Sequence, residues 1–142
     1  MKDGLRIIDC DLHVIENEDL FDKYLDPKFH AHLPKYLGWG PTNFPHWDAG
    51  GQMIPPWARD AVVVGPQKAL DAGSEDIYAP IREKKYDPDS TVAAMDVEGI
   101  DEAVMFRTFA SMFLSIDSLA GDVATAYAAA FNDWLADYCA AH

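Results

Sequence analysis

The sequence predicts an α/β protein whose strands pair in parallel. Two short apolar segments, 5–13 and 100–106, have the pattern of strands, and helical patterns cover 90–98 and 119–140. Strands that alternate with helices indicate parallel pairing. Because parallel sheets are buried on both faces and contain several strands, these two strands indicate the opening part of a larger barrel or sheet.

Composition excludes several classes of protein. The 142 residues suffice for one domain, and 49% hydrophobic residues can form a core. Because 24 acidic and 11 basic side chains give a formal charge of −13, we expect no nucleic acid and no membrane as partner. The sequence shows no signal-peptide pattern and no metal-type cysteine spacing, so we expect a cytoplasmic protein with two reduced, buried thiols.

The first expected strand, 5–13, alternates apolar and polar residues along its length. Successive side chains of a strand point to opposite faces. The alternation therefore predicts two sets, with Ile8, Cys10 and Leu12 on one face and Asp9, Asp11 and His13 on the other.

A long insertion or lid is expected over 17–89. It opens with a helix near Glu18–Tyr24, and a second helical piece is expected over Lys28–Tyr36. The stretch Gly38–Trp57 is rich in glycine, proline and tryptophan, which predicts no regular element, whereas Ala61–Val64 has the pattern of a brief strand. So long a connection in a compact domain is usually functional.

Regular structure is expected again from residue 90. Asp89 or Ser90 is expected to cap the helix over 90–98, and Gly99 to end it in the left-handed conformation. The strand over 100–106 follows. Apolar residues then recur every three or four positions along the carboxyl-terminal helix, so its tryptophan and tyrosines are expected to be packing residues.

Asp11 and His13 form the candidate metal site. Residues two apart in a strand project from one face, and an oxygen and a nitrogen ligand suit a divalent metal such as Zn²⁺, Mn²⁺ or Fe²⁺. Their position at the carboxyl end of a parallel strand is where α/β barrels place catalytic groups. Asp9, one pleat deeper, is expected to orient a ligand or a water. The alternative is an edge strand whose polar face meets water.

Two residues outside this strand are candidates for substrate contact. Arg107 follows the second strand, where it is placed to bind a substrate carboxylate or, alternatively, to pair with a nearby acid. His46 lies in the expected loop, either as a substrate contact or as a packed loop histidine. His30 and His32 have metal-type spacing, but in a helix such positions cannot share an ion, so we expect them to face solvent.

A phosphatase is the alternative enzyme class. An apolar strand that ends in Asp-x-Asp is similar to the haloacid dehalogenase phosphatases, in which Asp9 would be the nucleophile and Asp11 the general acid. The imidazole of His13 counts against this interpretation.

Two motifs carry a more specific resemblance. Residues 8–16 (IDCDLHVIE) and 95–104 (MDVEGIDEAV) resemble the amidohydrolase-related metal-dependent hydrolases (amidohydrolase 2), a group that includes the aminocarboxymuconate semialdehyde decarboxylase-like enzymes. The segment 128–135 (AAAFNDWL) is similar to the helix that follows the second strand in that family.

The resemblance implies the amino-terminal part of a TIM (β/α)8 barrel, with a long insertion after the first strand and with the barrel incomplete in this chain. A whole barrel takes about 250 residues. The implied cofactor is one divalent metal, with Asp11 and His13 as ligands. Asp9 and Glu16 would support a ligand or contact the substrate. The other ligands and the catalytic groups are expected on strands that this chain lacks.

The implied activity is hydrolysis of an amide or ester bond, or decarboxylation. The substrate would be a small carboxylated or aromatic molecule, and we expect the 142-residue chain to be inactive alone. A different class stays open, namely a non-catalytic truncated or interaction subunit that completes a barrel with another chain. A homo-oligomer also stays open.

Overall fold

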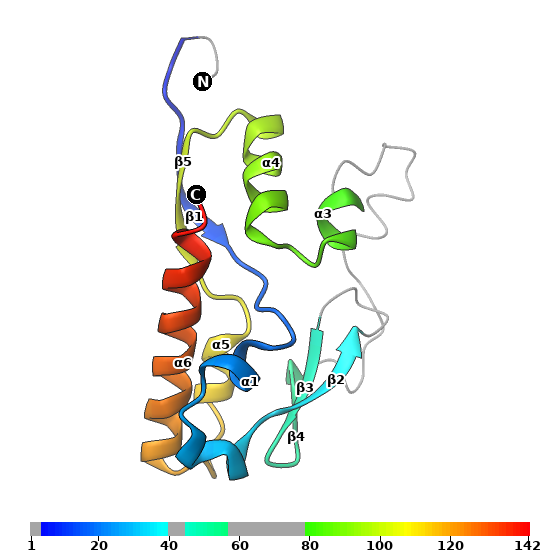
Figure 1. The fold of residues 1–142 in the computed structure, drawn as a ribbon, viewed down its shortest axis with the longest axis vertical. Coiled ribbons are helices and arrows are strands. Elements are labelled where there is room, and N and C mark those ends of the chain that lie inside the picture. The colour runs from blue at the N-terminus through cyan, green and yellow to red at the C-terminus, as the bar shows by residue number, and fades with distance from the viewer. Residues whose placement is uncertain (1–3, 40–44, 57–78) are drawn as a thin grey trace.

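The computed structural model describes residues 4–39, 45–56 and 79–142 (Figure 1). Within these ranges the elements, in chain order, are β1 (Ile8–His13), α1 (Leu20–Tyr24), the 3-10 helix η1 (Pro27–His32), β2 (Lys35–Trp39), β3 (Pro45–Ala49), β4 (Gln52–Ile54), α3 (Ala79–Glu83), α4 (Pro88–Glu98), β5 (Glu102–Phe106), α5 (Ala110–Leu114) and α6 (Gly121–Cys139). β1 and β5 pair in parallel, whereas β2, β3 and β4 form an antiparallel sheet. The α/β class and the parallel pairing are therefore confirmed, and the described strands form no closed barrel.

A β-bulge interrupts β1. Asp9 pairs with Ala103 and Leu12 pairs with Met105, so two residues of β1 lie opposite the single Val104. Ala103 and Met105 line a space that they share with α4 and α6, which defines the helix-covered face of the sheet. Because paired residues point to the same face, Asp9 and Leu12 also belong to this face.

The predicted alternation along the first strand is therefore wrong. Asp9 lies on the face opposite His13, which pairs with Phe106, and the bulge leaves Cys10 and Asp11 exposed. The thiols of Cys10 and Cys139 are free, as expected, but both are exposed rather than buried. One extra residue in the strand is the physical reason that Ile8 and Leu12 lie on opposite faces rather than on one.

The segment after β1 contains more regular structure than its composition predicts. The helical piece expected over Lys28–Tyr36 ends at His32, and Tyr36 lies in β2. Within Gly38–Trp57, where no regular element was expected, β3 and β4 form a hairpin whose turn residues Gly50 and Gly51 have φ values of 62° and 84°. Two glycines with positive φ suit a tight hairpin turn, so here glycine connects strands rather than ending them. The strand expected over Ala61–Val64 lies outside the described residues.

The helix expected over 90–98 is confirmed as α4, although it begins two residues earlier. Asp87 is the capping residue, rather than Asp89 or Ser90, because its Oδ1 accepts a hydrogen bond from the Ser90 backbone nitrogen at 2.8 Å. Gly99 ends the helix with φ 78° in the left-handed conformation, as predicted.

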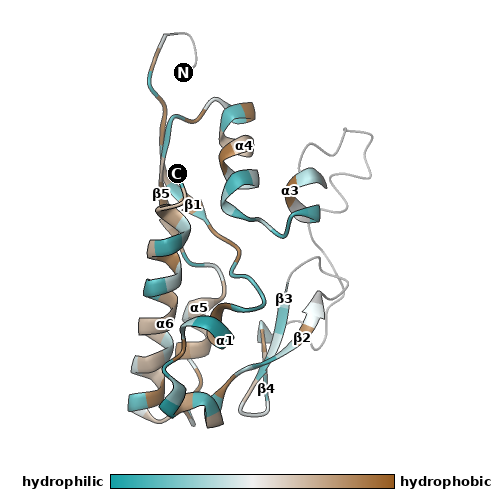
Figure 2. Cartoon of the chain, viewed as in Figure 1, coloured by the Kyte–Doolittle hydropathy of each residue, from teal (hydrophilic) through white to brown (hydrophobic). Residues whose placement is uncertain are grey.

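Aromatic side chains from four separate segments form the core. Phe113 of α5 packs edge-on against Phe21 of α1 and Trp47 of β3, with ring centroids 4.8 and 5.5 Å apart, and it also contacts Tyr127 of α6. Apolar and polar residues alternate around α6 (Figure 2), and its buried face confirms the predicted packing role of its tryptophan and tyrosines. Helix α5 was not predicted.

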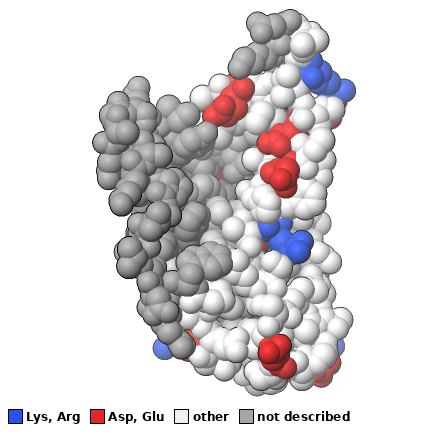
Figure 3. Space-filling view, turned by 180° about the vertical axis from the view of Figure 1, so that it is seen from behind, with Lys and Arg blue, Asp and Glu red and all other residues white. Residues whose placement is uncertain are grey.

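The described part of the face in Figure 3 carries dispersed charge. Acidic and basic side chains are scattered there between wide uncharged areas. Of the helices that the structure describes, none combines the length and the apolar character that a membrane span requires.

Candidate functional site

Asp11 and His13 lie together at the end of β1. The Nε2 atom of His13 is 3.4 Å from Oδ1 of Asp11, and the two side chains are 54% and 81% exposed. The residues are thus adjacent and accessible, as the spacing predicts, although Asp11 lies in a bulge rather than in a regular strand. That they bind a metal stays a prediction.

The main chain of Arg107 orients the His13 ring. Its carbonyl oxygen lies 2.7 Å from Nδ1 of His13. Because a carbonyl oxygen only accepts, Nδ1 carries the proton and the neutral ring keeps its lone pair on Nε2. That lone pair is on the ring edge nearest to Asp11, so the pair offers one nitrogen and one carboxylate oxygen. This donor set fits a divalent cation of hard or borderline character.

Asp9 stabilises the bulge that presents Asp11. Its Oδ1 accepts a hydrogen bond of 2.9 Å from the backbone nitrogen of Asp11. A bulge leaves a backbone group without its partner in the ladder, and the Asp9 carboxylate compensates for that loss here. That Asp9 also orients a metal ligand or a water, or contacts the substrate, stays a prediction.

Glu16 is buried, with 2% of its surface exposed. Its carboxylate accepts hydrogen bonds from three consecutive backbone nitrogens, those of Thr108 (3.0 Å), Phe109 (2.9 and 3.0 Å) and Ala110 (2.9 Å). Burial raises the pKa of the Glu16 carboxyl above its ordinary value, while the backbone N–H groups oppose that rise. Because these contacts occupy both oxygens, Glu16 acts on the turn that follows β5.

Arg107 and His46 occupy different parts of the molecule. Arg107 directly follows β5 and is exposed, and the group that contacts His13 is its carbonyl rather than its guanidinium. His46 was expected in a loop but lies in β3, where it is buried, and burial lowers the pKa of its imidazole. β3 belongs to the antiparallel sheet, whereas Asp11 and His13 belong to the parallel pair.

The structure adds a further connection that the sequence pattern did not predict. The Thr108 hydroxyl donates to the Val14 carbonyl at 2.6 Å, and the Val14 nitrogen donates to the Phe106 carbonyl at 2.8 Å. These bonds extend the pairing of the two strands beyond their ends. The sequence could not identify this contact, because a threonine shortly after a strand is a common feature.

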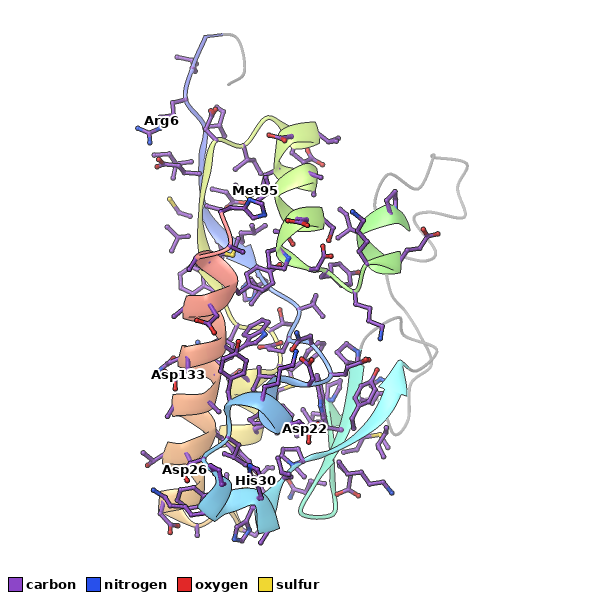
Figure 4. The ribbon with its side chains drawn as sticks, viewed as in Figure 1. Arg6, Asp22, Asp26, His30, Met95 and Asp133 are labelled. Carbon is purple, nitrogen blue, oxygen red and sulfur yellow. The ribbon has the colours of Figure 1, made fainter. Side chains whose placement is uncertain are left out.

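No cluster of three or more histidine, cysteine, aspartate or glutamate residues in a metal-binding arrangement occurs within 4–39, 45–56 and 79–142. Asp11 and His13 therefore offer two ligands. His30 lies in η1 near the first turn of α6, away from β1, and its Nε2 bonds the Leu25 carbonyl at 3.0 Å (Figure 4). His32 of η1 is exposed, as expected.

Comparison with solved structures gives an informative similarity. No family profile matches the chain, and no curated protein matches it. The crystal structure of amidohydrolase map2389c from Mycobacterium avium subsp. paratuberculosis K-10 is similar, with a TM-score of 0.59 and 26% sequence identity. The match covers 95% of this chain and 38% of that protein, so the chain spans well under half the length of the amidohydrolase. The similarity supports an amidohydrolase-like fold for this chain.

Proposed function

We propose that this chain is part of a metal-dependent hydrolase or decarboxylase of the amidohydrolase-related group. The similarity to an amidohydrolase supports a hydrolase-family function at a coarse level. The TIM barrel, the metal and the substrate class belong to the proposal.

The observation that carries the proposal is that His13 Nε2 and Asp11 Oδ1, two possible ligand atoms for one cation, lie 3.4 Å apart. Hydrogen bonding of Nδ1 to a carbonyl leaves Nε2 as the ligand atom, an arrangement common among metal-binding histidines. A divalent cation bound here, Zn²⁺, Mn²⁺ or Fe²⁺, would supply Lewis-acid chemistry and lower the pKa of a water.

The face of the sheet that carries His13 is consistent with a barrel interior. Ile8, Val104 and Phe106 share this face by register and are 50%, 49% and 40% exposed. Apolar side chains so exposed on a parallel sheet indicate a face that further strands would cover. In the proposed enzyme, Asp11 and His13 would stand at one end of that interior.

The other candidate residues would act on the substrate. The exposed guanidinium of Arg107 is suited to bind a carboxylate, so a small carboxylated or aromatic molecule is the proposed substrate class. His46 and the segment 17–89 would contribute to a lid over it. Because the described residues offer two ligands, further ligands would come from additional strands, on a longer or complementing chain, and the 142 residues alone would turn over little substrate.

Metal titration of the 142-residue chain tests this proposal. We expect equilibrium dialysis with Zn²⁺, Mn²⁺ and Fe²⁺ to give weak binding at one site, and His13→Ala or Asp11→Asn to weaken it at least about tenfold. His32→Ala is the matched control, because it removes an exposed histidine from η1 and should leave binding unchanged.

Equal binding by the chain and its His13→Ala variant would overturn the assignment of this site. Phosphatase turnover that Asp9→Asn abolishes and His13→Ala preserves would instead support the phosphatase alternative.

A further inference from the structure

We propose that Glu16 is a positioning residue, which fixes the ring of His13 through the main chain of Arg107. This inference deepens the proposed function and rests on it for its catalytic meaning, although its test reads the His13 ring directly.

The first step is the binding of the turn by Glu16. Three consecutive N–H groups, from Thr108 to Ala110, converge on one carboxylate at 2.9 to 3.0 Å. Successive backbone N–H groups of this kind form a concave anion site, which here holds a side chain of the same protein. The turn immediately after β5 therefore has its conformation fixed by a side chain 92 residues earlier.

The second step joins that turn to the candidate ligand. Arg107 directly precedes Thr108, so the peptide unit between them presents its N–H to Glu16 and its carbonyl to Nδ1 of His13. A displacement of the Thr108 nitrogen moves the Arg107 carbonyl, because both groups belong to one planar peptide. Glu16 thus acts on His13 through a single rigid unit.

The third step concerns which nitrogen of His13 is free. The Arg107 carbonyl keeps the proton on Nδ1 and the lone pair on Nε2, toward Asp11. Without this carbonyl the neutral ring would also populate the other tautomer, whose lone pair on Nδ1 points away from Asp11. Glu16 therefore selects the form of His13 that can share a cation with Asp11.

The tautomer of His13 is measurable by nitrogen-15 NMR on protein labelled at its 5 histidines, at a pH where the rings are neutral. His13→Gln identifies the His13 signals. We expect the Nδ1–H form to dominate in the wild type and its ratio to the other form to fall about fivefold in Glu16→Gln, the change that corresponds to one ordinary hydrogen bond. Gln is close in shape but turns an N–H donor toward the N–H groups of the turn.

Glu16→Asp is the second variant, in case Glu16→Gln does not fold. It keeps the charge on a shorter side chain and should give an intermediate ratio. Tyr138→Phe is the matched control, because it deletes a buried hydroxyl that bonds the Tyr86 carbonyl at 2.8 Å and the Thr91 hydroxyl at 2.7 Å. It should lower stability without a change in the His13 tautomer.

An unchanged tautomer ratio in a folded Glu16 variant would overturn the inference, as would an equal change in Tyr138→Phe. The tautomer measurement and the metal titration can fail independently. If the Glu16 variants shift the tautomer ratio but the chain binds no metal, Glu16 is a positioning residue and the metal site is rejected. If the chain binds metal but the tautomer ratio does not change, the metal site stands and the role of Glu16 is rejected.

Discussion

At the scale of single residues, two carboxylates near the candidate site bind backbone N–H groups. Asp9 satisfies the backbone nitrogen of Asp11 within the bulge, and Glu16 satisfies three nitrogens after β5. An unpaired buried N–H costs about 1 to 3 kcal/mol, so Glu16, whose bonds to Phe109 and Ala110 are buried, contributes to folding as well as to the geometry of His13.

The burial of Glu16 predicts a pH dependence of stability. Because its pKa is raised in the folded protein, the folded state binds the proton more tightly than the unfolded state, whose value is near 4.5. The contribution of Glu16 to the free energy of unfolding should be full below that unfolded value and decline as pH rises through the folded value. Urea unfolding of the wild type and of Glu16→Gln across this pH range measures that contribution.

Glu16→Gln should show a shallower fall in unfolding free energy over the same pH range, since its amide does not titrate. Parallel pH profiles of the two proteins would contradict the shifted pKa. At neutral pH we expect the variant to be less stable by about 1 to 3 kcal/mol, because it replaces an acceptor of several N–H groups by an amide.

At the scale of elements, the beginning of α4 distinguishes two similar aspartates. Asp87 accepts from the Ser90 nitrogen at 2.8 Å, and the Ser90 side chain, together with this backbone bond, lowers the pKa of the Asp87 carboxyl. Asp89, two residues later, bonds the exposed His142 at 2.8 Å instead. The structure thus assigns the cap to the residue just before Pro88, a position from which proline can begin the helix.

Replacement of Asp87 by Ala should lower the free energy of unfolding by about 1 kcal/mol, the ordinary cost of a lost helix cap. Asp89→Ala should cost less than half of that, because an exposed ion pair contributes little. Chemical denaturation of both variants gives the comparison. A larger loss in Asp89→Ala would assign the cap to Asp89, one of the two residues that the sequence predicted.

At the scale of the whole molecule, an aromatic core joins segments that lie far apart in sequence. Helix α6 contacts α1, η1 and α5 (Figure 1). Trp47 of β3 packs on the rings of Phe109 and Phe113. The antiparallel sheet is thereby attached to the same core as the helices. The open face of β1 and β5 has no such cover among the described residues, and there Ile8, Val104 and Phe106 are exposed.

Phe113→Ala should therefore destabilise the whole molecule by about 3 to 5 kcal/mol, because it removes a ring that is 1% exposed and contacts three other rings. Leu114→Ala, at the next residue, is the control, since Leu114 is 44% exposed and should lose far less. Thermal unfolding followed by near-ultraviolet circular dichroism compares them. Similar midpoints for both variants would place Phe113 outside the core.

The sequence predicted elements well where it carried either a clear end signal or a periodic pattern. Gly99 marked the end of α4, apolar periodicity marked α6, and both helices are present. Gly50 and Gly51 misled the interpretation, because glycine favours a hairpin turn as readily as an irregular loop, and the choice depends on strands that pair through tertiary contacts.

For the candidate site, the sequence by itself determined which groups are available: a carboxylate at Asp11, an imidazole at His13, and their position at the end of a strand. Only the tertiary structure decided that a bulge separates Asp9 from them and that Arg107 and Glu16 take part, through a carbonyl and three N–H groups. The physical reason is that the local sequence fixes the spacing of side chains along a strand, whereas backbone N–H and C=O groups are nearly the same at every residue and carry no such pattern. Which of these meet across more than 90 residues is settled by packing.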